Sequence, residues 1–327
     1  MSASSSSWRS AVGPKLAAFV SEPSAPQPLG VLRIGVAALL LIQAWSLSQS
    51  LPELLGNRGW VPWSVSEALA SPSVPRVDAV VAALAPLGIS QTAGIQALAF
   101  VYVVALVGLL LGLHTRLSAV VAWVIHTVLL NSISFFSYGV ETFAHISLFY
   151  CAVMPVGAAF SLDVRAGRRS SAPSALATLS LRLLQVHLCV IYLATGLEKL
   201  LGPVWRDGTA LWEVLMQPQY GQFDFAWLAV VPWMVKLSTW GTLVVEVGYA
   251  VCVWPRRTRG LWVALTVGMH LGIAVMMGLW LFSGMMTVLT FAAFGWPLVA
   301  EAMVTRVRAM ALLPFHSGPA RQASQGE

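Results

Sequence analysis

The feature that most constrains this chain is a series of apolar segments, each close to the length that a lipid bilayer requires. A hydrocarbon core about 30 Å thick is crossed by about 20 apolar residues of helix. Backbone polar groups find no water inside lipid, so such segments are expected to be α-helices. We therefore predict an all-α integral membrane protein with about eight transmembrane helices. The predicted spans are residues 31–47, 94–113, 117–135, 140–158, 180–199, 234–254, 260–280 and 282–299.

The composition is typical of an integral membrane protein. Hydrophobic residues make up 57% and charged residues 10% of the chain, against roughly 25% charged in soluble domains. The net charge of +6 does not indicate a nucleic-acid partner, because cytoplasmic membrane loops are enriched in Lys and Arg. The expected partner is the lipid bilayer, and the expected location is a bacterial inner or plasma membrane. No metal site is predicted, since the three cysteines are isolated inside apolar runs.

The basic residues predict one orientation. Lys and Arg fall before the first span, between the second and third, and after the fourth, sixth and eighth, all on one side of the membrane. Both termini are therefore predicted to be cytoplasmic. The predicted domain organisation is a flexible cytoplasmic tail at 1–27, a transmembrane domain at 28–300 and a cytoplasmic tail at 301–327. The residues concerned are Arg9, Lys15, Arg116, Arg165, Arg168, Arg169, Arg256, Arg257, Arg259, Arg306, Arg308 and Arg321.

Two long connections, 48–93 and 200–233, fall on the opposite face and are rich in tryptophan. Each is expected to contain a short interfacial helix, one after Trp63 with a Ser cap and one with Asp207 as its cap. Two interpretations of the tryptophans stay open: each anchors the bundle at the headgroup level, or together they cover a cavity. They are Trp60, Trp63, Trp205, Trp212, Trp227 and Trp233.

A polar stripe runs along the predicted span 180–199. Gln185, Tyr192 and Lys199 recur every seven residues, so they share one helix face. A lipid-facing surface is apolar, so this stripe is expected to face the bundle. Lys199 lies at the outer end, where the alternative is an anchor whose ammonium group reaches the interface.

Other ionisable residues also lie at membrane depth. Each is a functional candidate by default, and the alternative is a satisfied hydrogen bond between helices. Glu141 and His145 are four residues apart, so they share a face near the outer end, at the depth of Lys199. The remaining members are His126, His187, Glu246 and His270, and counting along the spans places Glu246 and His270 near the midplane.

Five segments, in order between residues 28 and 295, resemble the HTTM (horizontally transferred transmembrane) family. This is the membrane domain shared with vitamin K-dependent gamma-carboxylase. The combination is fairly specific, whereas any one segment alone is weak. The segments read LRIGVAALLL, HTRLSAVVAWVIHTVLLN, FSLDVR, LRLLQVHLCVIYLATGLEKLLGPVWRDGTAL and RTRGLWVALTVGMHLGIAVMMGLWLFS.

The resemblance implies a chemistry. In that carboxylase a reduced vitamin K is deprotonated and reacts with oxygen, and the resulting strong base removes a proton from a glutamate, to which carbon dioxide adds. Its general base is a lysine in a Tyr-x-x-x-Gly-x-x-Lys context, which Tyr192, Gly196 and Lys199 match here. The resemblance therefore implies Lys199 as base and a reduced quinone, of vitamin K or menaquinol type, as cofactor. Together with the polar residues at membrane depth, the predicted catalytic set is Lys199, Glu198 and Tyr192, and the predicted substrate-binding set is Glu141, His145, His270, Trp205 and Arg206.

Two departures from the family bear on the function. Glu198 stands where the carboxylase has a second lysine, and its negative charge favours the charged form of Lys199. The large lumenal portion that binds the carboxylase's protein substrate is also not expected here. The leading prediction is a quinol-dependent, carboxylase- or oxygenase-like membrane enzyme with a lysine base at the outer face. The alternatives are a membrane partner or maturation factor for a secreted peptide, and a small-molecule carrier.

Overall fold

The computed structural model describes residues 4–133 and 138–311, and the regular structure there is helical. Five helices in these ranges are long and apolar enough to cross a membrane. They are Gln27–Leu55, Gln91–Leu111, Ala175–Leu201, Arg256–Met277 and Trp280–Thr305. The first combines α2 (Gln27–Leu47), η1 (Ser48–Ser50) and α3 (Leu51–Leu55), and the next three are α6, α10 and α14. The last combines α15 (Trp280–Thr290), the π-helical η7 (Phe291–Gly295) and the start of α16 (Trp296–Ala311).

The other three predicted spans coincide with helices that are shorter or more polar. They are α7 (Thr115–Ser132), α8 (Gly139–Val153) and α13 (Pro232–Cys252). The 15 residues of α8 reach only roughly 22 Å, and α13 contains both Lys236 and Glu246. The structure therefore confirms a helical protein with five membrane-length apolar helices, and the count of eight stays a prediction.

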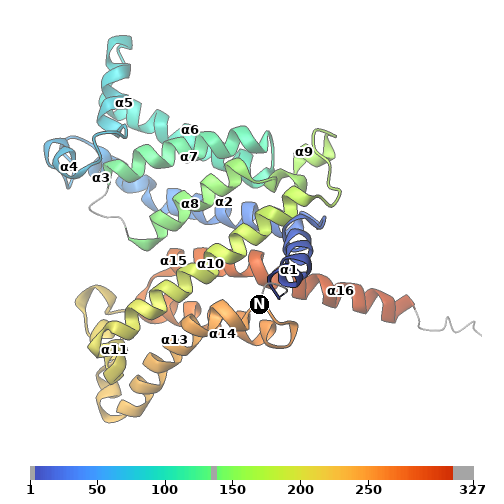
Figure 1. Cartoon of the computed structure of the whole chain (residues 1–327). Helices are drawn as coiled ribbons and strands as arrows, with labels where there is room; N and C mark the ends of the chain where they lie inside the picture. The colour runs from blue at the N-terminus through green and yellow to red at the C-terminus, as the bar shows by residue number, and fades with distance from the viewer. Residues whose placement is uncertain (1–3, 134–137, 312–327) are drawn as a thin grey trace, which may run out of the picture.

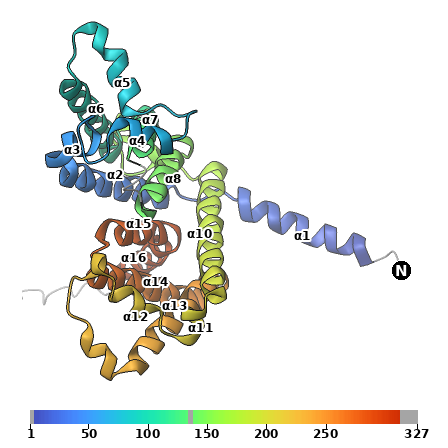
Figure 2. The same ribbon diagram turned by 90° about the vertical axis from the view of Figure 1, so that its left-hand side faces the viewer.

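The long helices form two groups that meet at α15. Figure 2 shows α2, α6, α7 and α8 above, α13, α14 and α16 below, and α10 running alongside both. Helix α15 contacts α2 and α8 on one side and α14 on the other. A continuous apolar core joins the two groups. Its fully buried members include Leu32, Leu106, Leu148, Leu188 and Met285.

The short helices separate toward the two ends of the bundle. In Figure 1, α3, α4 (Trp63–Leu69), α5 (Val77–Leu84) and α11 (Pro203–Asp207) lie toward the left, whereas α9 (Leu162–Arg165) and α16 extend to the right. An ion pair between Arg256 and Glu301, 3.1 Å long, ties the start of α14 to α16 at the right-hand end. The other short helices are η2 (Ala85–Leu87), η4 (Val156–Ala158), α12 (Ala210–Leu215), η5 (Pro218–Tyr220) and η6 (Ala226–Val230).

The two predicted interfacial helices exist, but their predicted caps are wrong. Helix α4 begins at Trp63 after Pro62, so no serine caps it. Asp207 ends α11, and Gly208, at φ +79°, separates it from α12, which begins after Thr209.

An 18-residue helix, α1 (Ser4–Ser21), covers most of the segment predicted as a flexible tail. Its end is held against α10: Ser24 pairs with Ser174 in an isolated antiparallel bridge. The Arg182 guanidinium also lies 4.2 Å from the centre of the Phe19 ring. The rest of α1 projects away from the bundle (Figure 2).

Candidate functional site

The predicted base, Lys199, forms an ion pair within the helix bundle. It lies in the last turn of α10, and its Nζ donates to both carboxylate oxygens of Glu246 on α13, at 2.7 and 2.9 Å. The Thr195 hydroxyl, one turn earlier, lies 3.4 Å from Oε2 of the same carboxylate. The Glu246 side chain is 9% exposed and that of Lys199 26% exposed. Glu246 is therefore enclosed by the bundle, and the pair is accessible from the Lys199 side, at the end of α10.

Glycine at position 196 allows α10 and α13 to approach this closely. A Cβ there would lie 2.8 Å from Cγ2 of Val247 and 3.2 Å from Cβ of Glu246. Gly196 is therefore level with Glu246, and Lys199, one turn farther out, turns its side chain back into the bundle. A lysine that only anchors the helix extends toward the headgroups instead.

Tyr192 and His270 form a second polar contact deeper in the bundle. The Tyr192 hydroxyl lies 2.8 Å from Nε2 of His270 on α14 and 3.5 Å from the Thr290 hydroxyl. Tyr192 and His270 are 2% and 3% exposed. The other ring nitrogen of His270, Nδ1, is buried and has no hydrogen-bond partner among the described residues. Its hydrogen-bonding capacity is therefore unused among the described residues.

The polar stripe faces the bundle, as predicted. Gln185, Tyr192 and Gly196 are buried, and Nε2 of Gln185 donates to the Ala293 carbonyl at 2.7 Å. Lys199 and Glu246 lie 47 positions apart in the chain, and sequence reasoning missed that they pair. Glu246 was placed near the midplane, so the only signal available was an acidic residue without an assigned partner.

The other residues predicted around Lys199 form no hydrogen bond with its side chain in the described structure. The Trp205 ring on α11 lies 5.5 Å from the Lys199 Nζ. Glu198 and Arg206 are exposed, and their side chains form no hydrogen bond or ion pair within the part of the chain that the structure describes. The carboxylate that forms the ion pair with Lys199 is thus that of Glu246 and not that of Glu198.

Glu141 and His145 belong to a different polar group, in the other half of the bundle. Glu141 accepts hydrogen bonds from Nε2 of Gln43 at 3.3 Å and from the Tyr138 backbone at 2.8 Å. His145 lies 3.5 Å from the Thr127 hydroxyl. Neither contacts Lys199 in the described structure, although all three were predicted at one depth.

Glu141 lines a cavity of about 250 Å³ between α2, α6 and α7. Apart from Gln43, Tyr102, His126 and Glu141, its walls are mostly apolar. The Tyr102 hydroxyl lies 3.0 Å from Nδ1 of His126, whose Nε2 is 3.3 Å from the Glu141 carbonyl. A second cavity of about 410 Å³, largely apolar, lies between α13 and α14. Among the described residues no group of three or more His, Cys, Asp or Glu side chains can hold a metal ion.

The tryptophans of the long connections fall into separate clusters. Trp63 packs against a small core that contains Leu55 and Val77, whereas Trp212 packs against one that contains Leu215 and Leu228. Trp60, Trp227 and Trp233 are each more than half exposed. This arrangement favours tryptophans that anchor the bundle separately at the interface over tryptophans that together cover one cavity. Of this group, Trp205 lies beside the Lys199 ion pair.

Comparisons with protein-family models, with curated proteins and with solved structures find no match for this chain. The resemblance to the HTTM family therefore depends on the five sequence segments alone.

Proposed function

We propose that this chain is an HTTM-type integral membrane protein in which Lys199 and Glu246 form a proton-transfer centre for a reduced quinone. The observation that supports it most is the Lys199–Glu246 pair itself. Placing two charges at membrane depth costs free energy, which interhelical packing alone does not require. The pair also occupies the position where the resembled family has its base.

The proposal includes an orientation. Helix α9 and the start of α14, which carry Arg165, Arg256 and Arg257, lie toward one end of the bundle in Figure 1, here called the basic end, and α3, α4, α5 and α11 of the tryptophan-rich connections lie toward the other. By the positive-inside rule the basic end is cytoplasmic. We therefore propose eight spans in a bacterial inner membrane, with both termini inside and Lys199 near the outer face.

The geometry suggests how Lys199 becomes a base. Its ammonium form cannot accept a proton, but the Glu246 Oε2 at 2.7 Å can take one from it. This transfer leaves a neutral amine beside a neutral acid. The amine then accepts the hydroxyl proton of the quinol, so the quinolate forms next to the new ammonium group. In the resembled carboxylase the deprotonated quinol reacts with oxygen, and we place this chain in the same quinol-dependent class.

Two further groups fit a ring-bearing ligand at this centre. Trp205 provides an aromatic surface within 5.5 Å of the amine. His270 offers a buried ring nitrogen without a partner in the described chain, for a polar atom at the far side of the ring. Neither residue transfers the proton, so both are assigned to binding.

The test uses reduced menadione as probe and the full chain in detergent. Saturable quenching of tryptophan fluorescence is expected on binding, together with faster oxygen consumption by the quinol, which reacts as its anion. Lys199→Arg is expected to bind with near-normal affinity but to lose at least about tenfold in oxygen consumption, because guanidinium is not deprotonated in proteins. Lys199→Ala is expected to lose both the saturable quinol binding and the faster oxygen consumption.

Lys236→Arg is the matched control, since Lys236 is an exposed lysine on the neighbouring helix, and it should behave as the parent protein. An unchanged rate in Lys199→Arg would assign the lysine to anchoring. Quenching that never saturates would favour the membrane-partner or carrier alternatives.

A further inference from the structure

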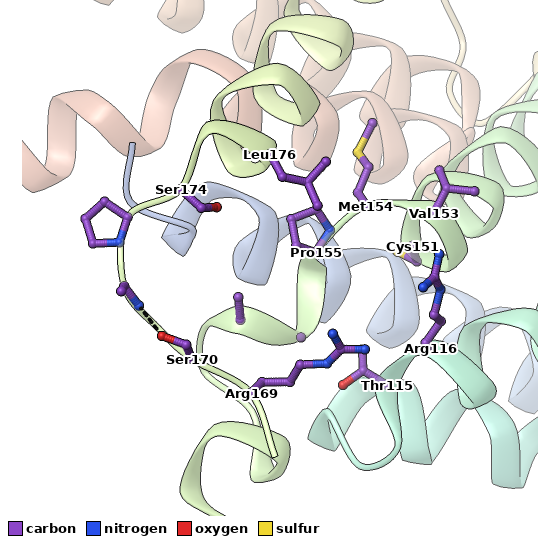
Figure 3. Close-up of a pocket in the computed structure, with 14 residues that line it drawn as sticks. Thr115, Arg116, Cys151, Val153, Met154, Pro155, Arg169, Ser170, Ser174 and Leu176 are labelled. Carbon is purple, nitrogen blue, oxygen red and sulfur yellow. Dashed lines mark hydrogen bonds between the residues drawn. The ribbon is translucent and has the colours of Figure 1, made fainter. Parts of the chain in front are cut away.

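A third cavity, of about 380 Å³, lies at the basic end of the bundle, far along α10 from Lys199. Its walls come from the start of α7, the end of α8 with the loop that follows, and the segment that leads into α10. Arg116, at the start of α7, and Arg169, in the loop after α9, both line it, and Figure 3 shows the Arg169 side chain extending toward Thr115.

The two guanidinium groups have unused hydrogen-bonding capacity. Nε of Arg116 donates to the Ala152 carbonyl at 3.1 Å. Its terminal nitrogens, and the whole Arg169 side chain, have no acceptor within the described residues. The Asp163 carboxylate, which lines an adjoining cavity together with both arginines, is already paired with Arg168, whose Nη2 lies 2.9 Å from Oδ1. The cavity therefore has a surplus positive charge.

Two hydroxyl groups complete a polar side of the cavity. The Ser170 oxygen accepts from the Ala172 backbone at 3.2 Å, and the Ser174 oxygen accepts from that of Ala177 at 3.1 Å. In both, the O–H group remains available to donate. Guanidinium and hydroxyl donors around one space are the recognition chemistry of a phosphate group.

The other side of the cavity is apolar and opens toward lipid. Val153 on α8 and Leu176 on α10 line it and are 44% and 55% exposed. Exposed apolar side chains continue along the same helices, with Phe149 one turn before Val153 and Leu183 two turns after Leu176. A bound molecule that places an anion between the arginines can thus lay a hydrocarbon chain between α8 and α10.

We infer that this cavity binds the headgroup of an anionic phospholipid, with the phosphate between Arg116 and Arg169 and an acyl chain against Val153 and Leu176. A free phosphate uses the arginines but leaves the apolar side empty. The basic end of the bundle is also where an anionic leaflet attracts Lys and Arg. This inference depends on the chain lying in a membrane and is independent of the chemistry at Lys199.

Native mass spectrometry of the full chain in detergent tests it, with dioleoyl phosphatidylglycerol as probe and dioleoyl phosphatidylcholine for comparison. We expect tighter binding of phosphatidylglycerol, weakened about fivefold by Arg169→Gln and further by adding Arg116→Gln. Arg169→Lys keeps the charge and should retain most of the affinity. Lys199→Arg should bind the lipid normally, so failure at one site is distinguishable from failure at the other.

Arg257→Gln is the matched control, because it removes an exposed positive charge from the same end. An equal loss in Arg257→Gln and Arg169→Gln would overturn the inference in favour of general surface charge. Equal binding of the two lipids would also overturn it. Displacement of the lipid by millimolar inorganic phosphate would show a small-anion site instead.

Discussion

Lys199 and Arg33 both lie within the bundle, but their hydrogen-bond partners differ in kind. Lys199 pairs with a carboxylate that can exchange a proton with it. Arg33, in contrast, is completely buried and donates to five backbone carbonyl groups, at 2.5 to 3.3 Å. Carbonyl oxygens do not take protons at ordinary pH, so Arg33 is structural. The five acceptors are Leu109, Leu110, Val156, Ala159 and Phe160.

Arg33 provides hydrogen-bond donors for backbone carbonyl groups at the end of α6 and in the loop after α8. The last carbonyls of a helix have no partner within the helix, and a buried loop needs its polar groups satisfied. A planar guanidinium with five N–H donors can serve both at once. The sequence offered only an arginine near the start of an apolar run, which gives no indication of contacts more than 70 residues away.

We therefore expect Arg33→Met to be among the most destabilising substitutions in the chain. It leaves five carbonyls without this donor, at about 1–3 kcal/mol for each that stays buried and unpaired. Arg33→Lys, with three donors, should be intermediate. Thermal unfolding in detergent, followed by tryptophan fluorescence, measures the order. Equal melting temperatures for Arg33→Met and the exposed control Arg257→Met would contradict it.

At the scale of elements, the start of α7 is fixed by a residue from another helix. Asp163 on α9 accepts hydrogen bonds from the backbone nitrogens of His114 and Thr115, at 3.0 and 2.8 Å, and from the Thr115 hydroxyl at 2.7 Å. His114 adopts φ +42°, in the left-handed region. A distant carboxylate thus does what an N-cap side chain usually does.

This carboxylate gives the stability a pH dependence. Burial by itself would raise the pKa of Asp163, but hydrogen bonds from Thr115, Arg168 and the His114 backbone lower it well below the ordinary value. A carboxyl with a depressed folded-state pKa stabilises the fold above its unfolded pKa, about 3.9, and loses that contribution as the pH falls toward the folded value.

Asp163→Asn should lower the melting temperature at pH 7, by the equivalent of about 1–3 kcal/mol for the lost charged hydrogen bonds. The difference between parent and variant should shrink below about pH 4, where the unfolded carboxyl protonates. Melting curves between pH 7 and the lowest pH that the detergent tolerates measure this. A difference that grows on acidification would show the opposite linkage.

Element types were predictable because hydrophobic length and period depend on local sequence alone. Every predicted span coincides with a helix, and the prediction that the Gln185–Tyr192 face of α10 points into the bundle is confirmed. The caps of α4 and α12 were wrong because Ser and Asp cap helices only where the chain enters at a suitable angle. The residue at the N-cap is Pro62 for α4 and Thr209 for α12, and neither makes a side-chain capping hydrogen bond.

At the scale of the whole molecule, the sequence indicated depth but not lateral position. Counting along spans placed Glu141, His145 and Lys199 at one level, yet they lie in different halves of the bundle. The same counting separated Lys199 from Glu246, which the structure joins. Which helices are neighbours depends on the fit of side chains across interfaces, such as Gly196 against Val247, and a single sequence does not reveal this.

The proposed membrane topology depends on how Lys, Arg and Trp are distributed along the chain. Lys and Arg are retained on the cytoplasmic side during insertion, and α9 and the start of α14, which carry arginines, lie toward the same end of the bundle as α16 in Figure 1. The short helices α3, α4, α5 and α11 form the opposite end. If an odd number of spans separated two of the Lys- and Arg-bearing loops, those two loops would lie at opposite ends of the bundle.

Single cysteines tested with a membrane-impermeant maleimide in intact cells decide the topology. The chain's own Cys151, Cys189 and Cys252 are replaced first, although the first two are buried. Ser64→Cys and Gln219→Cys should label from outside, because these exposed residues lie in the tryptophan-rich connections. Ala166→Cys and Arg257→Cys should label only after the membrane is opened. Labelling of either in sealed cells would reverse the orientation or change the number of spans, and it would move Lys199 to the cytoplasmic face.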